Sequence, residues 1–133
     1  MSARTAFINA RLIDPGSGLD VTGAILVEGA TITDLGPRLF NDGKPANAGI
    51  IDCAGQILAP GLIDLRVFTG EPGAEHRETL ASAAESAAAG GVTSFVTMPT
   101  TDPVIDDAAL VDFLKRRAAA TAKVNIYPGA ALT

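Results

Sequence analysis

Two charged residues within one short apolar stretch are the first candidates for chemistry in this sequence. The stretch Leu62–Phe68 lies between two Pro-Gly turn signals, and apolar runs of this length are typical of buried strands in parallel sheets. Because side chains alternate along a strand, Asp64, Arg66 and Phe68 are expected to share one face. Asp64 could be the neighbour of a metal site, but we predict the structural alternative, an ion pair with Arg66.

The other metal-binding residue types form no cluster in the sequence. His76 is the only histidine and stands among charged residues after a turn, so we interpret it as a solvated residue at a helix start and not as a lone ligand. Cys53, the only cysteine, is interpreted as a small core residue. The glutamates are expected to form a solvated helix face that benefits from the helix dipole: Glu71, Glu75, Glu78 and Glu85.

The stretch Leu58–Gly73 resembles the first barrel strand of the amidohydrolase superfamily, and Glu71-Pro72-Gly73 makes it most similar to the dihydroorotase branch. That family has the pattern Pro-Gly-x-x-Asp-x-His-x-His-x-Arg-Glu-Pro-Gly. The resemblance implies two histidine ligands to zinc, adjacent on one strand face, at the positions of Arg66 and Phe68. It also implies an arginine that binds the substrate carboxylate at the position of Gly70.

This sequence departs from the family at each of those positions. Arg66 cannot deprotonate to become a ligand, Phe68 has no donor atom, and Gly70 has no side chain. The family's second motif, Met-Pro-Asn-Thr-x-Pro, has a substrate-contacting asparagine where this chain has Thr100. We therefore predict no retained catalytic, substrate-binding or metal-binding residue here, and no zinc or other cofactor; Asp64 alone is kept beside the former ligand positions.

The predicted elements describe an α/β protein in two parts. Residues 1–59 are expected to form a small antiparallel β module, part of a β-sandwich, with a hairpin at Gly29, which can adopt positive φ. A tight turn at Ala54-Gly55 is expected to separate the last two strands of the module. Its short strands are predicted at residues 6–12, 23–28, 31–35, 50–53 and 56–59.

Residues 60–133 are expected to hold the first three strands and two helices of a TIM (β/α)8 barrel. The strands are predicted at 62–68, 92–98 and 124–127, and the helices at 75–89 and 108–120. Asp106 or Asp107 is expected to cap the second helix, and Gly90-Gly91 to end the first as a C-cap, not to bind phosphate. Alternation of this kind implies right-handed βαβ units in a parallel sheet.

A whole barrel needs about 250 residues, so the barrel is predicted to be incomplete in a chain of 133 residues. We expect the rest of its own chain or another copy to complete it. A formal net charge of −5 argues against nucleic acid as a partner. No apolar run reaches the length of a membrane span and no export signal follows the first residues, so a cytoplasmic location is expected.

Two functions follow from the resemblance. The first is a non-catalytic dihydroorotase-like protein of pyrimidine biosynthesis that acts as a structural partner of aspartate transcarbamoylase. The second is an active, metal-dependent cyclic-amide hydrolase that takes its ligands from residues beyond this chain, with a metal-activated hydroxide and a carboxylate base. A third alternative, an unrelated α/β domain, is disfavoured by the combination of both motifs.

Overall fold

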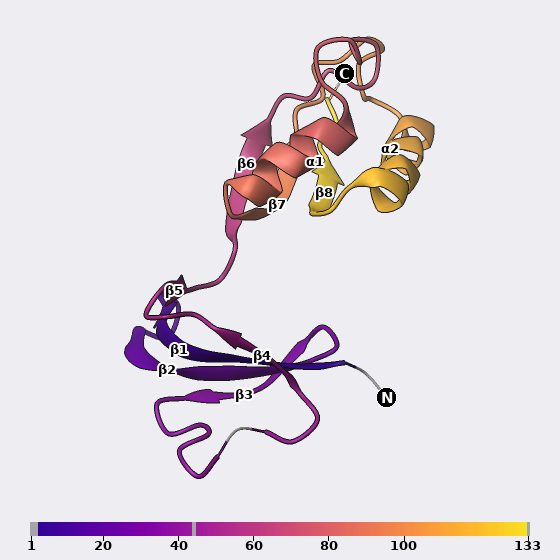
Figure 1. Ribbon diagram of the computed structural model, residues 1–133. Helices are drawn as coiled ribbons and strands as arrows, with labels where there is room; N and C mark the ends of the chain where they lie inside the picture. The colour runs from indigo at the N-terminus through magenta and orange to yellow at the C-terminus, as the bar shows by residue number, and fades with distance from the viewer. Residues whose placement is uncertain (1–2, 44, 133) are drawn as a thin grey trace. The chain divides into compact units, whose positions relative to one another are not determined.

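The computed structural model describes residues 3–43 and 45–132, and the chain divides into two compact units, Met1–Pro60 and Gly61–Thr133 (Figure 1). Each unit has its own sheet and its own buried residues. Among the described residues, the regular elements of the first unit are all strands, and the second unit alternates strands with helices. The α/β class predicted from the sequence is confirmed.

The first unit begins with an antiparallel meander. Its strands are β1 (Arg4–Asp14), β2 (Leu19–Glu28) and β3 (Thr31–Gly36), and both consecutive pairs are antiparallel. Gly29 has a φ of 62° between β2 and β3, a conformation that is free of strain for glycine. The predicted hairpin is therefore confirmed.

The last two strands of this unit differ from the prediction. β4 (Gly49–Asp52) and β5 (Ile57–Leu58) both pair parallel to β1. The predicted turn at residues 54–55 is present, with the Gln56 N–H donating to the Cys53 carbonyl at 2.8 Å. It does not fold the chain back, because the N–H groups of Cys53 and Gly55 donate to carbonyls of β1 at 2.8 and 2.7 Å. The sheet is consequently mixed, not purely antiparallel, and Cys53 is half-buried, not a core residue.

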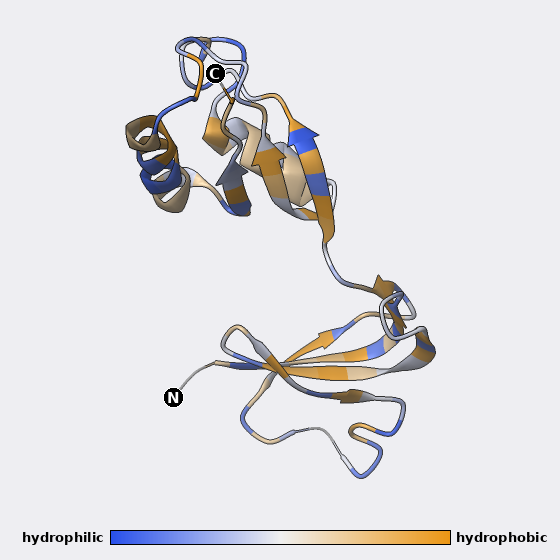
Figure 2. Cartoon of the chain, turned by 180° about the vertical axis from the view of Figure 1, so that it is seen from behind, coloured by the Kyte–Doolittle hydropathy of each residue, from blue (hydrophilic) through white to orange (hydrophobic). Residues whose placement is uncertain are grey.

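Alternation along β1 and β2 places small and branched apolar side chains on one buried face. These residues are Ala6, Ile8, Ala24 and Leu26. Ala10 and Leu12 are buried as well, but they follow the bulge in β1. Several larger apolar side chains of the same unit remain exposed, among them Ile32, Ile50 and Ile57. The colouring of Figure 2 shows apolar residues along these strands and mostly polar ones in the long loop after β3.

The second unit is a parallel three-stranded sheet in the order β6-β7-β8. Its strands are β6 (Leu62–Val67), β7 (Val92–Thr97) and β8 (Asn125–Pro128), joined through α1 (Leu80–Ala89) and α2 (Ala108–Thr121). This is the predicted strand–helix alternation. Within the described residues, neither helix has the length and apolar character needed to cross a membrane.

The predicted start of α1 is wrong, and the predicted start of α2 is correct. α1 starts at Leu80, not at residue 75, because Thr79 and Ser82 form a reciprocal capping box there. Residues 71–73 and 75–77 form turns instead, with the Ala74 N–H donating to the Gly70 carbonyl at 2.6 Å. The cap predicted for α2 is confirmed, since Asp107 accepts a hydrogen bond from the Leu110 N–H at 2.9 Å.

The core of the second unit lies between the sheet and the helices. It contains Leu80, Ala83, Ala84, Phe95, Ile105, Leu114, Ala118 and Ile126. β6 was predicted to be buried, yet Ile63 is 66% and Leu65 73% exposed. The reason is that Asp64 between them lies on the side covered by α1, so Ile63 and Leu65 project from the opposite face of the sheet, where the described residues leave them uncovered.

Two neighbouring residues of α2 should contribute very differently to the free energy of unfolding. Leu114 is 1% exposed and Phe113 is 45% exposed. Leu114→Ala is expected to lower the free energy of unfolding of the second unit by about 2–5 kcal/mol through cavity formation, and Phe113→Ala by less than about 0.5 kcal/mol. Urea unfolding followed by circular dichroism measures both; equal losses would mean that α2 packs on another face.

Candidate functional site

The predicted site residues stand on a bulge in β6. Asp64 pairs with Phe95, and Val67 pairs with Thr97. Between these two pairs, β6 has two residues, Leu65 and Arg66, and β7 has one, Val96. The extra residue forms a β-bulge in β6. A bulge of this kind bends the strand and changes the direction in which side chains leave it.

The bulge separates Asp64 from the other two candidates. Asp64 and Val67 line a cavity of about 230 Å³ together with Phe95 and residues of α1, so both lie on the side of the sheet that the helix covers. Arg66 and Phe68 flank Val67 and leave the strand on the opposite side by alternation. The prediction that Asp64, Arg66 and Phe68 share one face is wrong, because strict alternation fails across a bulge.

Asp64 makes a hydrogen bond to the backbone, not an ion pair. Its Oδ1 accepts from the Arg66 N–H at 2.9 Å, which is the donor at the bulge itself. The predicted ion pair between the two side chains is wrong. Asp64 holds the local backbone conformation, and the Arg66 guanidinium stays exposed on the other face.

Gly70 lies in a closely packed part of the loop that follows β6. A Cβ at this position would overlap the carbonyl oxygen of Ala74 and lie 2.7 Å from that of Glu78. Both are backbone atoms, so they cannot rotate away as a side chain could. The family's carboxylate-binding arginine would stand here, and the loop conformation of this chain leaves no space for any side chain.

Thr100 lies in the loop after β7 and is exposed. This loop contacts the loop after β6, because the Asp102 N–H donates to the Pro72 carbonyl at 3.3 Å. Gly73, with a φ of 97°, has no room for a Cβ beside the Asp102 carbonyl oxygen. The structure thus brings the two motif-bearing loops together at the C-terminal ends of β6 and β7, where β/α proteins build their sites.

Glu71 is the residue that sequence reasoning misjudged most. It was predicted to be solvated on a helix face, yet it precedes the helix and is 4% exposed. Its Oε2 accepts from the Leu80 N–H at 2.9 Å and its Oε1 from Arg117 Nε at 2.8 Å. One carboxylate therefore joins the loop after β6 to the start of α1 and to α2. The mixed apolar and charged sequence around it gave no signal of this burial.

The other acidic residues near this loop are more exposed. Glu75 and His76 lie in the turns before α1, not within it. Glu75 Oε1 accepts from the Gly73 N–H at 3.0 Å, and this bond is the main reason that the pKa of Glu75 lies below its ordinary value of 4.5. His76 is exposed, as expected.

The described residues do not fit a zinc ion. Across residues 3–43 and 45–132, no three His, Cys, Asp or Glu side chains come together in a group that could hold a metal. The positions that the resemblance assigns to histidine carry a guanidinium and a phenyl ring, neither of which donates an electron pair to a metal. Asp64, the acid kept nearby, is turned to the helix side and engaged by the backbone.

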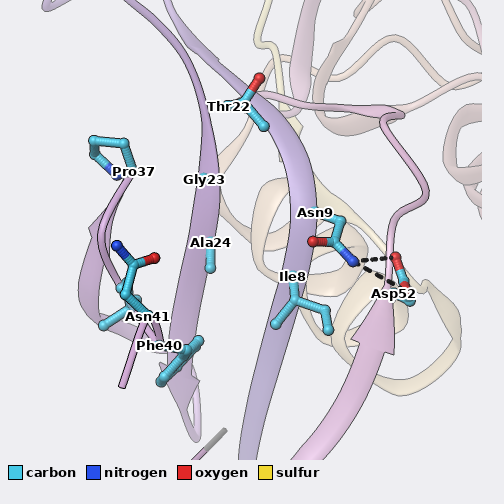
Figure 3. A pocket seen from close by; sticks show the side chains of 10 residues that line it. Ile8, Asn9, Thr22, Gly23, Ala24, Pro37, Phe40, Asn41 and Asp52 are labelled. Atoms are coloured by element: carbon cyan, nitrogen blue, oxygen red, sulfur yellow. Dashed lines mark hydrogen bonds between the residues drawn. The ribbon is translucent and has the colours of Figure 1, made fainter. Parts of the chain in front are cut away.

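A second cavity, of about 330 Å³, lies on the β module (Figure 3). Asn9, at a φ of 55° in the bulge of β1, donates its Nδ2 to both carboxylate oxygens of Asp52 at 3.0 Å. The Ala54 N–H also donates to Asp52 Oδ1, at 2.9 Å. Phe40 and Asn41 complete the rim. Because Asp52 joins the end of β4 to β1, we interpret this cluster as structural.

Comparison with known proteins places this geometry in context. Residues 55–133 match the family described as dihydro-orotase-like. The dihydroorotase of Wolbachia sp. subsp. Brugia malayi is 48% identical over 124 residues, which cover 92% of this chain and 28% of that protein. The dihydroorotase of Geobacter sulfurreducens is 42% identical over 123 residues, with 92% of this chain and 28% of the relative covered.

Solved structures show the same fold. The L-hydantoinase (dihydropyrimidinase) from Arthrobacter aurescens superposes with a TM-score of 0.83 at 24% identity, over 98% of this chain and 28% of the other. A D-hydantoinase from Thermus sp. gives 0.69 at 23% identity, over 96% and 27%. The chain spans only about 28% of the curated relatives that it matches.

Neutralising Glu71 should cost more stability than neutralising an exposed acid. Glu71→Gln keeps the shape but loses charge-assisted bonds to Leu80 and Arg117, and we expect a loss of about 1–3 kcal/mol in the free energy of unfolding. Glu85→Gln is the matched control, since its pair with Lys123 is mostly exposed, and we expect less than about 0.5 kcal/mol. Urea unfolding of each variant measures the difference; equal effects would contradict a joining role for Glu71.

Glu75 should contribute a defined part of the pH dependence of stability. Its pKa is lower in the folded chain than its ordinary value of 4.5, so its stabilising contribution is complete above 4.5 and is lost as the pH falls through the folded pKa. The wild type should therefore lose more stability than Glu75→Gln between pH 6 and pH 3. Urea unfolding across this range tests it, and identical slopes for the two proteins would refute it.

Proposed function

We propose a function on one premise: the chain belongs to the dihydro-orotase-like family. Our proposal is that it forms the N-terminal part of a dihydroorotase-like protein of pyrimidine biosynthesis. That protein does not carry out the hydrolase reaction and acts as a structural partner of aspartate transcarbamoylase. Because the matched part is about 28% of the relatives' length, activity and partner are properties of the whole protein.

The observation that carries the proposal is the closed backbone around Gly70. An arginine there would have to displace the carbonyls of Ala74 and Glu78, both part of the turns that lead to the capped start of α1. Loss of this residue type is therefore accompanied by a loop that no longer accommodates it. A single substitution would not recover the carboxylate-binding position.

The former ligand positions support the same proposal. Arg66 places a fixed positive charge where the resemblance implies a dication; at about 4 Å and an effective dielectric near 20, the repulsion is roughly 8 kcal/mol. Phe68 contributes no donor atom. Asp64, which the sequence retains, is used to hold the bulge. A fold that is kept while its site chemistry is absent must act through contacts.

One observation favours the alternative of an active metal-dependent cyclic-amide hydrolase. The relatives that are 48% and 42% identical to this chain carry the name dihydroorotase. An active protein would need all its metal ligands from segments that this chain does not include, together with a different carboxylate-binding residue.

The deciding experiment uses the whole protein and tests both its chemistry and its partner. We expect no tightly held zinc after dialysis and no ring closure of carbamoyl aspartate above background. We also expect co-purification with aspartate transcarbamoylase and a change in the stability of that enzyme. The Arg66→His, Phe68→His double variant should remain inactive, because Gly70 is unchanged.

The two functions give opposite results in this experiment. Stoichiometric zinc, together with a rate of ring closure that a chelator abolishes, would establish the hydrolase and contradict the non-catalytic proposal. Size exclusion with light scattering measures whether the two proteins associate. A protein that is inactive, does not associate with the transcarbamoylase and does not change its stability would contradict the proposed partnership.

A further inference from the structure

Residues 69–78, which we call the strap, join β6 to α1 without adding to the apolar core of the second unit. All of them are described by the structure, and none belongs to the core cluster or to the partly buried apolar residues packed against it. Thr69 and Glu71 are nonetheless buried, at 0% and 4% exposed. A segment that is buried without apolar packing is held by its polar contacts, and such segments open locally at a low free energy.

Hydrogen bonds inside the strap give it a shape of its own. The Ala74 N–H donates to the Gly70 carbonyl at 2.6 Å, and the Arg77 N–H donates to the Ala74 carbonyl at 2.9 Å. The Gly73 N–H donates to Glu75 Oε1 at 3.0 Å. Because these bonds begin and end within the strap, they restrain nothing outside it, and the strap can move as one piece.

Among the described residues, three hydrogen bonds join the strap to the elements that follow it. Two of them end on the Glu71 carboxylate, from the Leu80 N–H at 2.9 Å and from Arg117 Nε at 2.8 Å. The third, from the Asp102 N–H to the Pro72 carbonyl, is long at 3.3 Å. The attachment therefore rests mainly on one carboxylate, and the Arg117 side chain that pairs with it is 46% exposed.

The elements at both ends of the strap have attachments that do not involve Glu71. At the start of α1, Thr79 and Ser82 form a capping box, which satisfies the first turn of the helix by itself. At the end of β6, the Met98 N–H donates to the Val67 carbonyl at 2.8 Å. Release of Glu71 consequently leaves the helix and the strand in place, so that the opening is confined to the strap.

We propose that the strap is a conformational switch that the Glu71–Arg117 ion pair holds closed and that opens as one piece when this pair is broken. The opening is all-or-none because of burial. Without Arg117, the Glu71 carboxylate would keep only one N–H partner, and a buried charge with so little compensation is costly. It therefore moves into water and gives up the bond from the Leu80 N–H at the same time.

The strap lies where the loops after β6 and β7 meet. Its release breaks the bond between the Pro72 carbonyl and the Asp102 N–H, and so separates the two loops at the C-terminal ends of their strands. This change requires no metal ion, no catalytic step and no particular partner. It therefore stands or falls independently of the proposed function.

The test is hydrogen exchange, resolved to single amides, on the whole protein. The Leu80 and Asp102 N–H groups report on opening, because each donates to the strap, and the Met98 N–H reports on the pairing of β6 with β7. We expect Arg117→Gln to accelerate exchange at Leu80 and Asp102 by the same factor, roughly tenfold for a charged hydrogen bond that is half-exposed. Exchange at Met98 should not change.

Two further variants separate the ion pair from other effects of charge. Lys123→Gln is the matched control, since it breaks an exposed ion pair with Glu85 that does not involve the strap, and it should leave exchange at all three amides unchanged. The double variant Arg117→Gln, Glu71→Gln should exceed Arg117→Gln by no more than about twofold, because both substitutions remove the same attachment.

The wild type gives a test that needs no substitution. Raising the ionic strength from about 0.01 M to 1 M screens the half-exposed pair and should accelerate exchange at Leu80 and Asp102 together, whereas Arg117→Gln should not respond. Different factors at these two amides, equal acceleration at Met98, full additivity in the double variant, or no effect of Arg117→Gln would each overturn the proposal. Thermal unfolding of every variant confirms that folded proteins are compared.

Discussion

The carboxylate of Glu71 is the interaction on which the arrangement of the second unit depends. It is 4% exposed, and a buried carboxylate is costly unless its oxygens are paired. One oxygen accepts the first N–H of α1 and the other accepts from Arg117 on α2. The negative charge also lies at the positive end of the α1 dipole. These contacts fix the loop after β6 against both helices at once.

Close backbone packing at the strand ends adds to this constraint. Gly70, Gly73 and Gly129 each lie where a Cβ would meet a carbonyl oxygen of a neighbouring segment. The loops after β6 and β7 and the end of β8 are thus held by main-chain contacts that need no particular catalytic side chain. This explains how the barrel-like fold persists although the positions that would bind metal and substrate carry Arg66, Phe68 and Gly70.

The open strand β6 has the opposite character. In the described residues, one edge of β6 is unpaired and its apolar side chains Ile63 and Leu65 are exposed. Because of the bulge, its polar residues do not alternate regularly between the two faces. Asp64 serves the backbone on one face while Arg66 projects from the other. Backbone support and surface charge are therefore assigned to different residues of one strand.

By itself, the sequence determined the order of strands and helices, the parallel character of the second unit, an aspartate cap at residue 106 or 107 and the hairpin at Gly29. Each of these follows from local periodicity, capping or glycine conformation. It also determined that positions 66 and 68, to which the resemblance assigns two histidines, carry arginine and phenylalanine, which is a matter of residue type alone.

Only the tertiary structure decided the burial of Glu71, the closed space at Gly70, the parallel pairing of β4 and β5 and the separation of Asp64 from Arg66. These features depend on atoms distant in sequence, such as Arg117 for Glu71 and β1 for β4. A bulge shifts side chains by a pairing register that one strand cannot reveal. The exposure of β6 likewise depends on which strands are present beside it, because burial is a property of neighbours and not of composition.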